Sequence, residues 1–124
     1  MRVTKLAQVS IHVKDLDRAV GFYTDMLGLE VAFRAEGMAF FELGGVTLML
    51  SLPSSPEFDH PSSILYFGVD DIDGAFRSLS GGGVPFRRPP VLVHRAADHE
   101  VWMAFFLDTE GNTLALTSRK ARTA

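Results

Sequence analysis

The stretch Val13-Lys-Asp-Leu-Asp-Arg-Ala-Val-Gly-Phe-Tyr-Thr-Asp-Met-Leu-Gly28 decides the fold of this chain. Asp15 is a good helix N-cap, because its carboxylate can accept a hydrogen bond from the backbone of the first turn. The apolar residues that follow recur at i, i+3, i+4 and i+7, which predicts an amphipathic helix over about 16–27. Gly28 can adopt the left-handed backbone that ends a helix. The stretch therefore predicts a capped helix that leads into a return strand.

The beginning of this stretch recurs later in the chain. Val69-Asp-Asp-Ile-Asp-Gly-Ala75 repeats the pattern of Val13-Lys-Asp-Leu-Asp-Arg-Ala19, and Gly81-Gly-Gly83 then stands where Gly28 stood. Internal self-similarity of this length indicates two copies of one structural unit. We therefore expect two modules, each with one helix and the strands around it.

Alternating apolar residues and turn signals complete each module. The first module is predicted to hold strands at about 5–13, 29–35, 38–43 and 46–52. The second is predicted to hold strands at about 63–69, 84–88, 100–107 and 113–118, with a helix at about 72–80. The prolines of residues 53–62 indicate a linker between the modules. The expected fold is α+β: a single domain over 1–124, with module 1 at about 1–52 and module 2 at about 63–118.

Composition narrows the function classes. The chain has 124 residues, no cysteine and a net charge of −3. The lack of cysteine excludes thiol catalysis and thiolate metal sites, and the charge argues against nucleic acid as a partner. No apolar run approaches the roughly 18 residues of a membrane span, so we expect a cytoplasmic protein without a membrane partner. The short basic stretch at 119–122 predicts a frayed, solvated terminus.

The strands carry a second face that is neither charged nor strongly apolar. An exposed sheet face should carry more Lys and Glu, whereas small, weakly polar and adaptable side chains suit a cavity for a small molecule. The alternative is a simple exposed, Thr-rich surface. The residues of this mixed face are Gln8, Ser10 and His12; Thr47, Met49 and Ser51; Ile64, Tyr66 and Gly68; and Thr113, Ala115 and Thr117.

Three segments together resemble the glyoxalase / bleomycin-resistance / extradiol-dioxygenase superfamily, also called vicinal oxygen chelate proteins. They are the run from His12 to Leu29, Phe67-Gly-Val-Asp-Asp71 and Phe106-Leu-Asp-Thr-Glu-Gly-Asn112. The resemblance implies two βαβββ modules whose eight strands form a half-open barrel around a ligand cavity. It also implies a homodimer, because the cavity in this superfamily often forms with or beside a second chain.

The resemblance is less specific for activity. Metalloenzymes of the superfamily bind one divalent metal through one residue from each of four strands. In this chain the four positions correspond to Gln8, Met49, Ile64 and Ala115. Isoleucine and alanine have no donor atom, and a thioether is a soft ligand that suits copper(I). Three of the four ligands are therefore absent, so we expect no metal cofactor and favour binding over catalysis.

Two further sets of residues are candidates for function. His12 and Trp102 are candidate ligand contacts, the first as a polar group and the second as a ring that stacks. His94, Asp98, His99 and Glu100 form the densest group of metal-capable side chains. This cluster is either a relocated metal site or, as its loop position favours, a solvated polar loop or lid.

The sequence leads to one main hypothesis and two alternatives. The main hypothesis is a metal-independent protein that binds a small organic molecule in a cavity. An enzyme of the superfamily is the first alternative: a lyase, isomerase or dioxygenase with a relocated metal or with acid–base chemistry. The second alternative is an interaction module whose dimer surface is the function. The predicted ligand-binding residues are Gln8, Ser10, His12, Met49, Ile64, Tyr66, Trp102 and Ala115.

Overall fold

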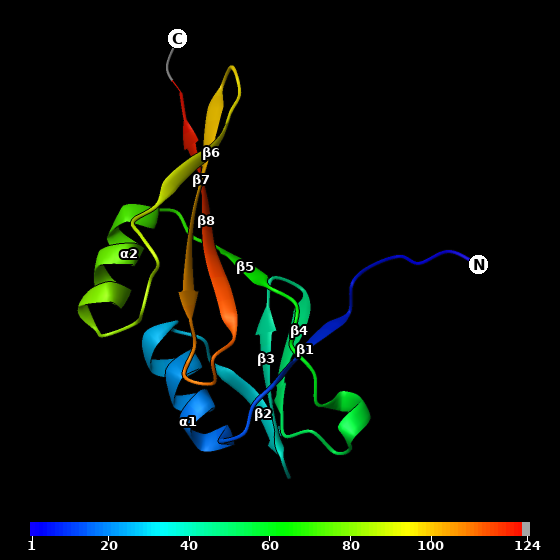
Figure 1. The fold of residues 1–124 in the computed structure, drawn as a ribbon. Coiled ribbons are helices and arrows are strands. Elements are labelled where there is room, and N and C mark those ends of the chain that lie inside the picture. The colour runs from blue at the N-terminus through cyan, green and yellow to red at the C-terminus, as the bar shows by residue number, and fades with distance from the viewer. Residues whose placement is uncertain (123–124) are drawn as a thin grey trace. The chain divides into compact units, whose positions relative to one another are not determined.

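The computed structural model describes residues 1–122, which fold into two compact units that meet in sequence between Ser63 and Ile64. Each unit contains one four-stranded mixed sheet and one main helix (Figure 1). Within the described residues, no helix is long and apolar enough to span a membrane.

The first unit contains one sheet of strand order β1-β4-β3-β2. Strands β1 and β4 pair in parallel, and the other neighbours pair antiparallel. A tight turn at Gly44 and Gly45, both with positive φ, joins β3 to β4. The elements in chain order are β1 Gln8–His12, α1 Leu16–Gly21, the π-helix η1 Phe22–Met26, β2 Val31–Ala35, β3 Met38–Leu43, β4 Val46–Ser51 and the 3-10 helix η2 Pro56–Phe58.

The second unit repeats this order as β5-β8-β7-β6, again with a parallel pair, β5 and β8, at one edge. Its elements are β5 Leu65–Gly68, α2 Ile72–Gly81, β6 Val91–Arg95, β7 His99–Leu107 and β8 Thr113–Ala121. The predicted α+β fold of two βαβββ modules is confirmed, and neither sheet is closed.

The internal repeat is visible in individual hydrogen bonds. Asp15 accepts a bond from the amide of Arg18 at 3.1 Å, and Asp71 accepts one from the amide of Gly74 at 3.0 Å. Both aspartates are therefore the N-caps that the sequence predicted. Just before each helix, the amide of Val13 donates to Ser51 O in the first unit, and its repeat equivalent donates to Thr117 O in the second, both at 3.0 Å.

Each unit has its own core between the helix and the apolar face of the sheet. Helix α1 packs against β3 and β4, and α2 packs against β7 and β8. The fully buried aromatic rings of Tyr23 and Phe41 lie 6.2 Å apart in the first core. The second core contains Ile72, Phe106 and Leu114, each at most 2% exposed. In both units the mixed face of the sheet is thus directed away from the helix.

The first helix differs from the prediction in its second half. Instead of an α-helix to about residue 27, the chain changes to a π-helix at Phe22. The Thr24 hydroxyl donates to the carbonyl of Val20 at 2.9 Å and reaches that of Gly21 at 3.2 Å. Because a hydroxyl bound to these carbonyls competes with the backbone amides, it favours the wider turn. Gly28 follows with a φ of 72°, as predicted for a helix stop.

The predicted strand over 84–88 is wrong. That segment makes only an isolated bridge between Phe86 and Phe106, where the Phe86 ring also lies against Phe76. The sixth strand is Val91–Arg95, in a stretch for which the sequence predicted no element. Pro89 and Pro90 lack amide hydrogens, so strand pairing begins only after them.

The sequence predicted that the basic stretch at 119–122 would be frayed, and this prediction is wrong. Strand β8 continues to Ala121, and Arg119 pairs with Val101 on β7. The ammonium group of Lys120 donates to Asp73 on α2 at 2.7 Å and lies 4.5 Å from the centre of the Trp102 ring. Ion pairing and contact with an aromatic ring therefore order this end of the described chain.

Candidate functional site

The strand register defines the mixed face of the first sheet. Residues directly opposite each other on neighbouring strands point to the same face. Ser10 on β1 lies opposite Met49 on β4, which in turn lies opposite Phe40 on β3. The next row begins at His12, which lies opposite Ser51. The predicted residues of β1 and β4 therefore share one face.

This face borders a cavity of about 280 Å³. The floor comes from β1, β3 and β4, one side comes from the turn between β2 and β3, and another comes from the segment after β4. Its lining residues are Ser10, His12, Glu36, Gly37, Met38, Met49, Ser51, Leu52, Pro53, Ser54 and Phe58. Three of the eight predicted ligand-binding residues, Ser10, His12 and Met49, meet there.

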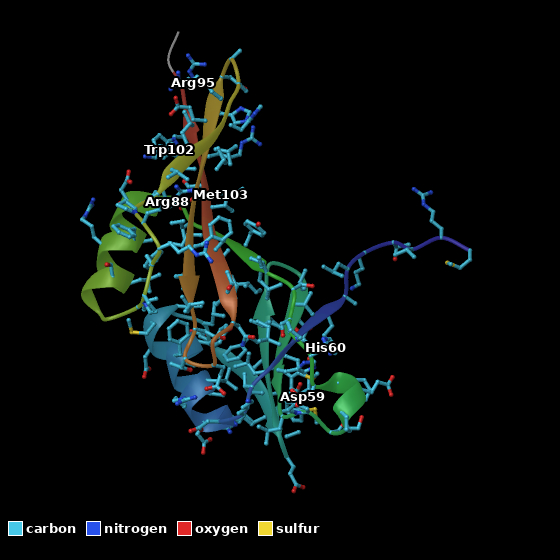
Figure 2. The ribbon with its side chains drawn as sticks, viewed as in Figure 1. Asp59, His60, Arg88, Arg95, Trp102 and Met103 are labelled. Carbon is cyan, nitrogen blue, oxygen red and sulfur yellow. The ribbon has the colours of Figure 1, made fainter. Side chains whose placement is uncertain are left out.

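His12 connects the sheet to the segment after β4. Its ring atom Nδ1 lies 3.2 Å from the carbonyl oxygen of His60, and its amide donates to the Ser62 hydroxyl at 3.3 Å. The two imidazole rings meet edge to face with centroids 4.9 Å apart. Figure 2 shows His60 on the segment that follows η2. Because a carbonyl oxygen can only accept, Nδ1 carries the proton, and in the neutral ring Nε2 is the acceptor atom.

Two side-chain contacts join β1 to β4 on the same face. The hydroxyl groups of Ser10 and Ser51 lie 3.3 Å apart. The side-chain amide of Gln8 donates to the sulfur of Met49 at 3.8 Å. Gln8 does not line the cavity, but this contact places it directly beside a residue that does.

Two of the predicted residues of the second unit, Tyr66 and Ala115, lie on the mixed face of the second sheet. Ala115 on β8 lies opposite Tyr66 on β5 and Phe105 on β7. The rings of Tyr66 and Phe105 meet edge to face at 5.8 Å, and Ala115 between them is fully buried. Ile64 precedes β5 and is 44% exposed. The cavity of the first unit contains none of these residues.

Trp102 lies on the other face of the second sheet, which corrects its grouping with Tyr66 and Ala115. Trp102 lies opposite Ser118, and the pairing between β7 and β8 is unbroken. Trp102 and Phe105 are separated by an odd number of positions along β7. Successive side chains of a strand alternate between faces, so Trp102 and Ala115 point to opposite sides. The indole nitrogen donates to Glu100 at 3.1 Å, which confirms that these two side chains share a face.

The cluster of His94, Asp98, His99 and Glu100 lies on the β6–β7 hairpin, where Figure 2 labels Arg95 and Trp102. His99 Nδ1 contacts Asp98 at 2.7 Å, and Arg95 contacts Glu100 at 2.9 Å.

These contacts set the charge of the two carboxylates. The hydrogen bond from His99 lowers the pKa of Asp98. The pKa of Glu100 is lowered first by the bond from the Trp102 indole and further by Arg95. Both carboxylates are thus bound to neighbouring side chains. Within residues 1–122, no group of three or more His, Asp and Glu side chains could hold a metal ion, so the relocated metal site is not formed.

The residues at the four positions that the resemblance assigns to the superfamily's divalent metal do not fit such an ion. At the β1 and β4 positions, the Gln8 amide nitrogen donates to the Met49 thioether. The side chains at these two positions therefore bind each other. The sulfur is also too soft a ligand for Zn²⁺, Ni²⁺ or Mn²⁺. The other two positions carry Ile64 and the buried methyl group of Ala115, neither of which has a donor atom.

Sequence reasoning missed most of the cavity wall. Residues 53–62 were interpreted as a linker, but Pro53, Ser54 and Phe58 line the cavity, and His60 contacts His12. The turn residue Glu36 and the strand residue Met38 were not singled out either. The available signal was a phenylalanine and a histidine within a proline-rich segment, since a solvated linker needs neither.

The comparisons with known proteins agree with this fold. The family model described as Glyoxalase/Bleomycin resistance protein/Dioxygenase superfamily matches residues 5–116. The chain belongs to this superfamily. Among solved structures, a member of the superfamily from Sphaerobacter thermophilus is 25% identical with a TM-score of 0.76, over 94% of this chain and 98% of that one.

Two further solved structures share the fold at lower identity. An integron cassette protein from V. cholerae is 22% identical with a TM-score of 0.77, over 95% of this chain and 97% of that one. A lactoylglutathione lyase from Agrobacterium tumefaciens is 21% identical with a TM-score of 0.72, over 95% of this chain and 96% of that one. At these identities, the likeness establishes the fold and leaves the activity to the residues of the site.

Proposed function

We propose that this superfamily member binds a small organic molecule in the cavity of its first unit, without the divalent metal of its metalloenzyme relatives. The observation that carries the proposal is the cavity itself, which is bordered by Ser10, His12 and Met49 on the sheet and by Phe58 above it. Small-molecule sites are concave and mostly apolar, with a few polar groups that orient the ligand. This cavity combines five apolar side chains, from two methionines, Leu52, Pro53 and Phe58, with hydroxyl, imidazole and carboxylate groups.

The donor set supports binding over metal-assisted catalysis. A metal that activates water or polarises a carbonyl needs about three protein ligands of N or O type. The Met49 sulfur occupies one of the required positions and lies against the Gln8 amide at 3.8 Å. Holding a ligand by shape, dispersion and hydrogen bonds requires no such set.

The test is a thermal-shift screen of a fragment library against the wild type and two variants. A ligand that binds the folded state raises the melting temperature by mass action. Ser10→Phe places a ring in the cavity, whereas Thr47→Phe adds the same ring on the same sheet face outside the lining. We expect the hits to lose their shift with Ser10→Phe and to keep it with Thr47→Phe. Hits that shift all three proteins equally would contradict the proposal, provided that circular dichroism shows both variants folded.

A further inference from the structure

The charged and polar groups of the cavity lining indicate which class of ligand the cavity takes. This inference goes beyond the proposed function and rests on it. Glu36 and His12 are the ionisable residues of the lining, and the lining contains no Lys or Arg. Glu36 lies in the turn between β2 and β3 and is exposed, so it stands at the rim of the cavity. A carboxylate without a neighbouring cation in the lining gives the cavity a negative potential.

The hydroxyl groups of the lining are compatible with a donor on the ligand. The hydroxyl groups of Ser10 and Ser51 lie 3.3 Å apart, and either can accept.

The apolar part of the lining is electron-rich as well. Met38 and Met49 contribute polarisable thioethers, and Phe58 contributes a ring. Thioether sulfur is a weak acceptor, and the face of an aromatic ring attracts cations. The cavity volume of about 280 Å³ lies at the lower limit of sites for drug-sized ligands, so it suits one ring with a short substituent.

We propose that the cavity takes a compact organic cation: a protonated primary amine on a single apolar ring. The ring packs among Met38, Met49 and Phe58, and the ammonium group is directed to the rim carboxylate of Glu36. An anion of the same size faces the Glu36 carboxylate, and the lining contains no Lys or Arg to pair with it. The cavity therefore binds a cation more tightly than an anion.

The experiment uses three probes that share one ring and differ in charge: benzylamine, benzyl alcohol and benzoate. Isothermal titration calorimetry on the full chain at low ionic strength measures each affinity, because salt screens exposed charges. We expect benzylamine to bind most tightly and benzoate most weakly, with the two separated by about tenfold. Glu36→Gln should lower the benzylamine affinity about two- to fivefold, the range for one exposed ion pair, and leave benzyl alcohol unchanged.

Glu57→Gln is the matched control. It removes the same charge from η2, next to Phe58 but outside the lining, so the order of the three probes should persist. Equal binding of the three probes, or tightest binding of benzoate, overturns the charge inference and leaves the proposed function intact. No saturable benzylamine binding up to about 10 mM also overturns it, and the fragment screen then decides the proposed function separately.

Discussion

The two units share one topology, and one row of side chains across their sheets illustrates how they differ. In the first unit this row is Ser10, Met49 and Phe40; in the second, the repeat equivalents are Tyr66, Ala115 and Phe105. The small Ala115 allows the rings of its two neighbours to meet across it at 5.8 Å.

In the first unit the larger Met49 stands between its neighbours, and the Phe40 ring contacts Phe33 on β2 instead, at 5.5 Å. The exchange of large and small residues therefore places a ring pair across the row in the second unit, whereas Ser10 and Met49 border the cavity in the first.

The largest expected loss of stability comes from changes in the core between the helix and the sheet of each module. Leu50 and Leu116 hold equivalent places on β4 and β8 and are at most 2% exposed. Leu50→Ala and Leu116→Ala should each lower the free energy of unfolding by about 2–5 kcal/mol, because each leaves a buried void. Urea denaturation followed by circular dichroism measures the change.

Met49→Ala is the control for this comparison. It removes a side chain of similar size from the neighbouring position on the opposite, partly exposed face. Met49→Ala should lower the free energy of unfolding clearly less than Leu50→Ala does. Equal costs would mean that the cavity face is packed as tightly as the core, which would contradict the distinction between the two faces.

The next effect tests the aromatic row of the second unit. Tyr66→Ala removes a half-exposed ring that contacts Phe105 and covers Ala115. We expect a loss of about 1–2 kcal/mol in the free energy of unfolding, from the ring pair and the apolar area it covers. In the first unit, Ser10→Ala removes only a hydroxyl pair with Ser51 and should cost less. A neutral Tyr66→Ala would show that the ring does not hold this face together.

A smaller effect tests the equivalence of the two helix starts. Asp15→Ala and Asp71→Ala each remove one cap hydrogen bond, of 3.1 Å and 3.0 Å respectively. Each should lower the free energy of unfolding by about 1 kcal/mol, the usual cost of losing such a cap. The matched variants Asp15→Asn and Asp71→Asn should retain most of the stability. A large difference between the two caps would show that the repeat is equivalent in sequence only.

The features that the sequence predicted correctly are local. The caps Asp15 and Asp71, the helix stop at Gly28 and the two faces of β1 and β4 each follow from neighbours along the chain. Each is fixed by backbone geometry or by alternation, so a single sequence contains the information.

The features that it missed depend on contacts between distant segments. Trp102 was predicted to contact the ligand together with Ala115, but the pairing of β7 with β8 places the two side chains on opposite faces. The cavity wall was missed for the same reason. Phe58 and His60 come from a proline-rich segment whose place above β1 depends on the His12 contacts. Sequence alone therefore predicted the fold better than the site.

The smallest expected effect concerns the charged side chains of the β6–β7 hairpin. The corresponding β3–β4 hairpin has a turn of two glycines instead. Glu100 accepts bonds from the Trp102 indole at 3.1 Å and from Arg95 at 2.9 Å, and the indole bond is the main cause of its lowered pKa. A lowered carboxyl pKa means that the stabilisation is complete above the unfolded-state pKa. It is lost as the pH falls through the folded-state value. Trp102 is the chain's single tryptophan, so its fluorescence reports this titration directly.

We expect the fluorescence of Trp102 to change with a midpoint below the ordinary pKa of glutamate, while the far-ultraviolet circular dichroism stays constant. Glu100→Gln keeps the size of the side chain and removes its titration, so the same change should be absent in that variant. Arg95→Gln removes the second partner only, and should raise the midpoint slightly without abolishing the change, because the indole bond remains. A midpoint at or above the ordinary value would show that Glu100 is not held by Trp102 and Arg95 in solution. The order of the β6–β7 hairpin would then not depend on the contacts of Glu100.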